Sequence, residues 1–142
     1  MKEYQMDRVE KALELHKQGY NCAQAVILAF EDWHKMNNIM LYKLTEALGF
    51  GMGDMNATCG AVSAAVMLAG IKNSAGDVST PTKSTTYKIG RQITSSFAKK
   101  NGSLVCRELK GVDTKIVLRS CPGCIEDSVR IAENVLQIKE DF

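Results

Sequence analysis

The sequence is poor in proline and carries no strong charge of either sign. It has two prolines in 142 residues and a formal net charge of +2, from 18 basic and 16 acidic side chains. Scarce proline and ordinary charge exclude a disordered linker protein, and the length predicts one domain, residues 1–142, with a core of its own. Because the two signs are interspersed, we expect no nucleic-acid partner.

Signals for targeting, membrane insertion and several familiar active sites are also missing. The first ten residues lack the apolar segment of a secretory signal. The longest apolar stretch, residues 57–71, is shorter than the roughly 20 residues that span a bilayer. The glycine fingerprints of nucleotide sites, the HExxH motif and the serine nucleophile elbow are absent. We therefore expect a cytoplasmic protein with no membrane insertion and no bound nucleotide.

Apolar side chains recur at helical spacing along the chain, and no alternating strand pattern is found. Helices are predicted over residues 3–18, 23–34 and 84–100, around a stripe of Leu41, Leu44 and Leu48, and in two segments that start at Ser103 and Ser120. Residues 57–71 are apolar almost all round, which is typical of a central helix packed on every side. The predicted fold is all-α, a single compact bundle of five to six helices around this buried helix.

What the sequence does contain is five cysteines. In a reducing compartment they indicate metal binding, a labile redox pair or core packing, not a structural disulfide framework. Four of them lie at predicted helix starts: Cys22 after Asn21, Cys59 after Thr58, Cys121 after Ser120, and Cys106 shortly after Ser103. A helix start favours a thiolate through its free N–H groups and the positive end of its dipole. The alternative is that the cysteines are buried in the core as small apolar residues and have no reactive role.

Cys121 and Cys124 form a CxxC motif, Cys121-Pro122-Gly123-Cys124. Such a pair can close a small disulfide or present two sulfurs to a metal. No histidine follows the motif, which excludes a haem attachment site, and there is no second CxxC for a zinc ribbon. The dispersed cysteines can still supply a thiolate site for zinc or an iron–sulfur cluster if the helix starts converge.

Glycines alternate over residues 49–54, just before Cys59. Gly51 and Gly53 can adopt positive φ, and Gly60 allows neighbouring backbones to approach, so these three are candidate cofactor-binding residues. A flexible link between two helices explains the loop equally well. The two histidines have ordinary interpretations, because His16 lies on an apolar helix face and His34 near a helix C-terminus.

These features together resemble the C_GCAxxG_C_C family of redox-active proteins. The resemblance covers nearly the whole chain, through Gly19-Tyr20-Asn21-Cys22-Ala23-Gln24-Ala25-Val26, Cys59-Gly60-Ala61, Cys106-Arg107-Glu108-Leu109 and Cys121. It implies a small helical protein that uses Cys22, Cys59, Cys106 and Cys121. A related domain in split-Soret cytochrome c holds an iron–sulfur centre beside its haems, but the haem part has no counterpart here, so no haem is expected.

The chain departs from the family pattern at two positions. Ala64 replaces the last glycine of CGAxxG, and Cys124 stands where the family usually has another residue. Family members tend to be encoded near transporter genes, which implies an association with a transport system.

Three hypotheses follow. The first is a redox or electron-transfer protein that binds an iron–sulfur cluster, zinc or another thiophilic metal through Cys22, Cys59, Cys106 and Cys121. The second is thiol–disulfide exchange, in which Cys121 attacks and Cys124 or Cys59 resolves the mixed disulfide. The third is a non-catalytic binding or structural module. The redox partner is unknown, a homodimer is expected of a helical bundle of this size, and whether the protein is an enzyme stays open.

Overall fold

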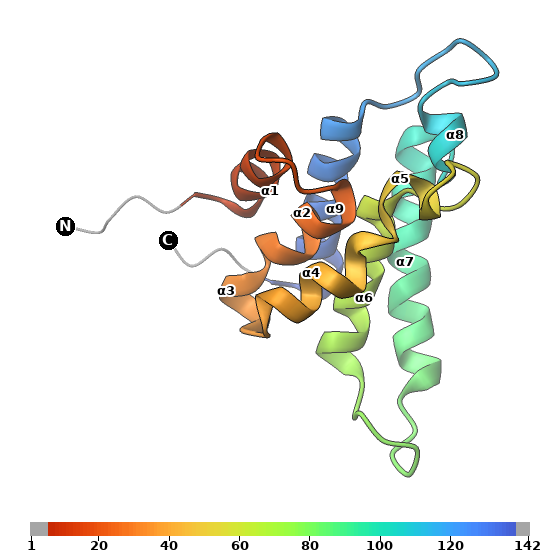
Figure 1. Ribbon diagram of the computed structural model, residues 1–142. Helices are drawn as coiled ribbons and strands as arrows, with labels where there is room; N and C mark the ends of the chain where they lie inside the picture. Colours follow the sequence, from red (N-terminus) through yellow and green to blue (C-terminus); the bar gives the residue numbers. More distant parts are fainter. Residues whose placement is uncertain (1–5, 139–142) are drawn as a thin grey trace.

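The computed structural model describes residues 6–138, and this part of the chain is helical without any β-strand. Six helices have eight or more residues and three are single turns (Figure 1). In chain order they are α1 (Arg8–Lys17), α2 (Cys22–Ala29), α3 (Glu31–His34), α4 (Asn38–Glu46), α5 (Gly49–Met52), α6 (Gly60–Asn73), α7 (Lys83–Asn101), α8 (Cys106–Leu109) and α9 (Cys121–Leu136). The all-α prediction is confirmed for these residues.

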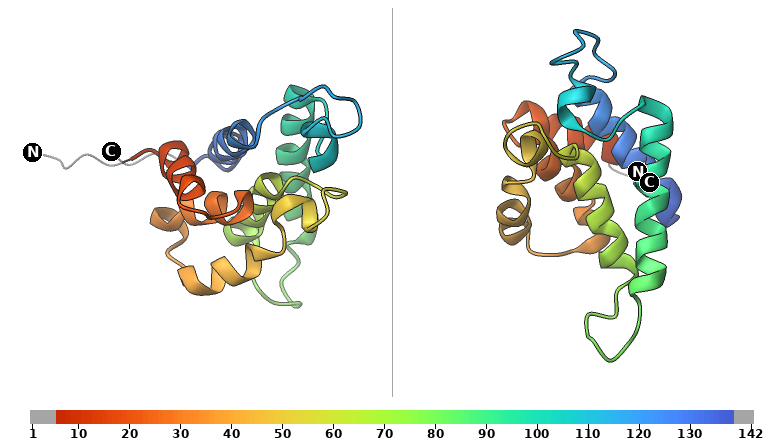
Figure 2. Two further views of the ribbon diagram at one scale, coloured as in Figure 1. Left: turned by 45° about the horizontal axis from the view of Figure 1, so that its top comes forward. Right: turned by 90° about the vertical axis from the view of Figure 1, so that its right-hand side faces the viewer.

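Helix α6 lies among the other long helices and packs against α2, α7 and α9 (Figures 1 and 2). Ala61, Ala64 and Ala65 are fully buried on it, and their small side chains let the neighbouring helices approach. Val66 and Met67 are only half-buried, on the side that faces α7. The prediction of a helix packed on every side is therefore wrong for this stripe.

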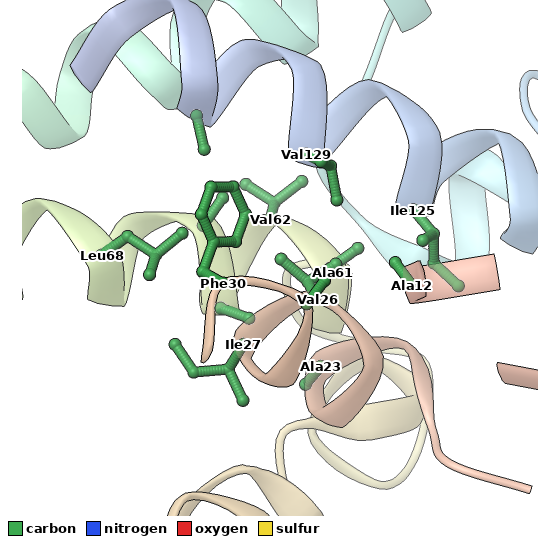
Figure 3. Close-up of a cluster of buried hydrophobic side chains, with 14 of the residues drawn as sticks. Ala12, Ala23, Val26, Ile27, Phe30, Ala61, Val62, Leu68, Ile125 and Val129 are labelled. Carbon is green, nitrogen blue, oxygen red and sulfur yellow. The ribbon is translucent and has the colours of Figure 1, made fainter. Parts of the chain in front are cut away.

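The core forms where α2, α6 and α9 meet (Figure 3). Phe30, at the end of α2, is fully buried beside Val62 of α6, and Val129 of α9 faces them. Full burial of side chains of this size contributes roughly 1.5–3 kcal/mol each. This apolar contact fixes the relative positions of three helices, two of which, α2 and α9, begin at a cysteine.

Several predicted helix limits differ from the observed ones. Helix α1 begins at Arg8 because Asp7 caps it through a hydrogen bond to Glu10 N, and residues 3–5 of the predicted helix lie outside the described residues. The predicted helix 23–34 is interrupted at Phe30, whose backbone leaves the helical region. Leu44, expected to face the core, is exposed, since α4 packs through Leu41 and Thr45.

No helix among residues 6–138 has the combination of length and apolar character needed to cross a bilayer.

Candidate functional site

Two of the five cysteines begin helices that have well-formed N-caps. Asn21 accepts a hydrogen bond from Gln24 N and completes a capping box, so Cys22 is the first residue of α2. Ser120 accepts from Gly123 N in the same way, which makes Cys121 the first residue of α9. Both cap predictions are confirmed.

Cys59 and Cys106 are positioned by a different device. Thr58 does not cap α6 but forms an isolated antiparallel bridge with Val105, and Cys59 itself is the N-cap residue. Cys59 N donates to Leu104 O at 2.8 Å, and Cys106 N donates to Ala57 O at 3.0 Å. The helix predicted from Ser103 therefore begins only at Cys106. This bridge joins the two backbone segments that carry Cys59 and Cys106, which are distant in the sequence.

All five cysteines line one cavity of about 170 Å³. They come from α2, α8, α9 and the residue that precedes α6, and Figure 1 shows α5 and α8 side by side near the start of α6. The other lining residues are His16, Asn21, Phe50, Gly60, Leu109, Lys110 and Arg119. The helix starts thus converge, as the thiolate-site hypothesis requires, and the fifth thiol, Cys124, joins them.

Three of the five thiols interact in the cavity wall, with Cys59 between Cys22 and Cys124. Cys59 contacts both Cys22 and Cys124 through side-chain hydrogen bonds. The hydrogen bond with Cys59, together with burial, raises the pKa of Cys22 far above its usual range. The hydrogen bond with Cys124 is the largest cause that raises the pKa of Cys59 to about 12.

The expectation that helix starts favour thiolates is wrong for three of these cysteines. Burial also raises the pKa of Cys106, although the positive charge of Lys110 opposes it. At neutral pH Cys22, Cys59 and Cys106 therefore hold their protons, because burial and neighbouring thiols outweigh the backbone N–H groups. All five cysteines are free thiols.

Of the residues that the structure describes, two cationic side chains and no carboxylate line the cavity. Lys110 hydrogen-bonds to Cys121 and also lies near Cys106 and Cys22. Burial tends to lower the pKa of Lys110, but the opposing interactions, of which that with Cys121 is the largest, outweigh it and raise the pKa. Arg119 is engaged differently, since its guanidinium binds Asp127 at 3.0 Å and Glu126 at 3.4 Å.

The three candidate glycines have different surroundings. A Cβ on Gly60 would lie 2.8 Å from Cys22 Sγ, and a Cβ on Gly51 would lie 2.6 Å from Cys106 Cβ. Gly53 has no neighbour within 4 Å of such a Cβ and does not line the cavity. Gly51 and Gly60 thus allow the backbone to approach the cysteines closely, whereas Gly53 serves the turn after α5, with φ of 91°.

The sequence interpretation of His16 missed its position in the cavity wall. The ring is half-buried, and its Nδ1 lies 3.1 Å from Tyr20 O, so Nδ1 donates a hydrogen bond to this carbonyl. The sequence signal that could have indicated this position is that His16, near the end of α1, lies six residues before Cys22. His34 instead binds Ile27 O and Met36 N, both backbone atoms, and is structural.

Within residues 6–138, no three His, Cys, Asp or Glu side chains are gathered around one point as a single metal ion would require. The donor type nevertheless fits a thiophilic group, because five soft sulfur donors surround one cavity.

Comparison with known proteins gives one match. The model of the C_GCAxxG_C_C family, whose description reads "Putative redox-active protein", matches residues 20–135. This range contains all five cysteines and most of the chain. No curated protein and no solved structure matches at a significant level.

Proposed function

The chain belongs to the C_GCAxxG_C_C family of redox-active proteins, and from this premise we propose that its five-cysteine cavity is the redox centre, which binds an iron–sulfur cluster or another thiophilic metal for electron transfer. The observation that carries the proposal is the convergence of five thiols from four segments on one cavity. Cysteines that served only as core filling would have no reason to share a single wall.

The chemistry of the wall supports a thiolate-bound metal. Cys22, Cys59, Cys106 and Cys121 would hold the group, and an iron–sulfur cluster would supply reversible one-electron transfer. Metal binding would displace the thiol protons. Lys110 and Arg119 would then offset the negative charge of the thiolates, which favours the metal-bound form.

The spacing of the thiols favours a polynuclear cluster over a single zinc ion. Among residues 6–138 the side chains are not gathered around one point, and the cavity of about 170 Å³ is several times the roughly 30 Å³ that one water occupies in the liquid. A cluster bridges ligands that stand apart, whereas a structural zinc site requires four donors at about 2.0–2.3 Å.

The test is anaerobic assembly with ferrous iron and sulfide, followed by metal analysis and a visible absorption spectrum. We expect the wild-type chain to bind iron and sulfide and to develop a charge-transfer band. The Cys59→Ala variant should bind at least about tenfold less iron than the wild type, because one ligand is lost. Cys124→Ala, which removes a thiol from the same wall outside the ligand set, should retain the cluster.

Two results would contradict this proposal. A colourless, metal-free protein with five titratable thiols would remove the cluster and favour a non-catalytic module. Equal loss of iron in Cys59→Ala and Cys124→Ala, with unchanged circular dichroism, would show that the ligand set is wrong.

A second function, thiol–disulfide exchange, is favoured by the contact between Cys59 and Cys124. Cys121 is the more accessible thiol of the CxxC motif, since Cys124 is buried. Cys121 would attack an external disulfide, release one thiol and form a mixed disulfide. Cys124 would then displace the other half of the reagent and form a disulfide with Cys121. In a last exchange Cys59, the neighbour of Cys124, would attack Cys124 and release Cys121 as a thiol.

We expect oxidised glutathione to convert the metal-free chain to a form that has lost two thiols, with two molecules of glutathione released as the thiol. Peptide mapping by mass spectrometry should locate the final disulfide between Cys59 and Cys124, the neighbouring pair. Cys121→Ser should slow its formation severalfold. A disulfide confined to Cys121 and Cys124, or an unaffected rate in Cys121→Ser, would speak against this route.

A further inference from the structure

Lys110 has an unusual environment for a lysine. Its side chain is half-buried in the wall of the cysteine cavity, and its Nζ lies 5.1 Å from the centre of the Phe50 ring. Among residues 6–138 no carboxylate forms an ion pair with it, so its neighbours are thiols and an aromatic face. A partly desolvated cation without a carboxylate partner attracts anions more strongly than a solvated surface lysine.

Phe50 is held beside Lys110 by an unfavourable backbone. Its φ of 57° and ψ of 39° lie in the left-handed region, which a bulky residue rarely adopts because the conformation is strained. The ring is half exposed and lines the cavity. Such strain persists where the surroundings require it, and here it places an aromatic ring beside the only cavity cation that is not paired with a described carboxylate.

We propose that Lys110 and Phe50 form a binding site for small aromatic or sulfur-containing anions at the cysteine cavity, and that this site directs anionic disulfides to Cys121. Lys110 supplies the charge, Phe50 supplies an apolar surface for the rest of the ligand, and Cys121, which lines the same cavity, supplies the nucleophile. Arg119 contributes less charge because Asp127 and Glu126 neutralise it. The inference rests on the thiol chemistry of the proposed redox centre.

The reaction step is one disulfide exchange. The Cys121 sulfur, as thiolate, attacks one sulfur of the anionic disulfide, whose S–S bond breaks while the protein–reagent S–S bond forms. The protein sulfur is oxidised, the other half of the reagent leaves as the reduced thiolate, and the thiol proton passes to solvent.

The test compares two aromatic disulfides on the metal-free chain, the dianion dithiobis(nitrobenzoate) and the neutral dithiodipyridine. Both reagents release a coloured product. Both rate constants are proportional to the thiolate fraction of the protein, so their ratio does not depend on that fraction. We expect Lys110→Gln to lower this ratio roughly fivefold, the size of a unit-charge interaction near 4 Å in water. Lys110→Arg should restore most of the ratio.

Lys88→Gln is the matched control. Lys88 is exposed in the first part of α7, and that end of the helix lies far from α8 in Figure 1. The substitution Lys88→Gln therefore removes the same net charge as Lys110→Gln but should leave the ratio of rate constants unchanged. In the wild type, added salt should slow the reaction with the dianion and not the reaction with the neutral reagent. This measurement tests the proposal without any variant. Peptide mapping after one equivalent of the dianion should find the label on Cys121.

An unchanged ratio in Lys110→Gln, an equal fall in Lys88→Gln, or first labelling at another cysteine would overturn the anion site. None of these results depends on iron binding, which is measured separately, so a failed anion site and a failed cluster proposal are distinguished.

Discussion

Gly60→Ala is expected to destabilise the fold by about 3 kcal/mol, because overpacking against a fixed backbone is costly. The added Cβ would lie 2.7 Å from Leu48 O and 3.2 Å from Gly49 Cα, both backbone atoms, and 2.8 Å from Cys22 Sγ. Neither side of this contact can move without displacing α5 or α2. The measurement is urea unfolding followed by circular dichroism.

Gly70→Ala, in the same helix, is the matched control. Beyond its own helical backbone, no atom of the described residues lies within 4 Å of a Cβ on Gly70, so alanine there should stabilise the protein by about 0.5–1 kcal/mol through its better helix propensity. Equal effects of the two substitutions would show that Gly60 is not a close-contact position. Gly60→Ala should also change the alkylation rate of Cys22, whereas Gly70→Ala should not.

Asp127→Asn should have the second large effect, a loss of about 2–4 kcal/mol near neutral pH, as for a broken buried ion pair. The Asp127 side chain is 2% exposed and accepts from Arg119, Asn101 and Lys100. Burial alone would raise the pKa of this carboxyl, but the hydrogen bonds from Arg119, Lys100 and Asn101 outweigh it and lower the pKa.

The pH dependence has a definite sign. Because the folded-state pKa of Asp127 is lowered, its contribution to stability is complete above the ordinary aspartate pKa of about 3.9. The contribution is lost as the pH falls through the lowered value. The difference in unfolding free energy between wild type and Asp127→Asn should therefore be largest near neutrality and shrink in acid.

Asp113→Asn provides the comparison, since Asp113 is 73% exposed in a 3.6 Å pair with Arg107 and should change stability by less than about 1 kcal/mol. A difference for Asp127→Asn that stays constant with pH would mean that its carboxylate charge does not stabilise the fold.

Local signals in the sequence predicted the parts of the site that depend on neighbouring residues. Asn21 and Ser120 cap α2 and α9 as expected, because a cap is a hydrogen bond between residues three positions apart. Thr58 is likewise a preferred N-cap residue directly before a cysteine, but its backbone pairs with Val105. That partner is distant in the chain, and no local pattern could have indicated the pairing.

The protonation state of the thiols was also beyond local reasoning. A helix start predicts a lowered cysteine pKa only when the sulfur is otherwise exposed. In this protein Cys59 contacts two further thiols and is buried, and that arrangement follows from how three helices pack. The lining role of His16 and the left-handed backbone of Phe50 likewise follow from tertiary contacts.

The pairing of Thr58 with Val105 also bears on the order of folding. Contacts between segments that are far apart in the chain close slowly, because the loop entropy must be overcome before they form. During synthesis Cys22 and Cys59 emerge long before Cys106, Cys121 and Cys124, so the nascent chain exposes two of its five thiols without their later neighbours. The cavity is complete only when α9 has docked on α6, and any cargo of the site is therefore loaded after α9 has been synthesised.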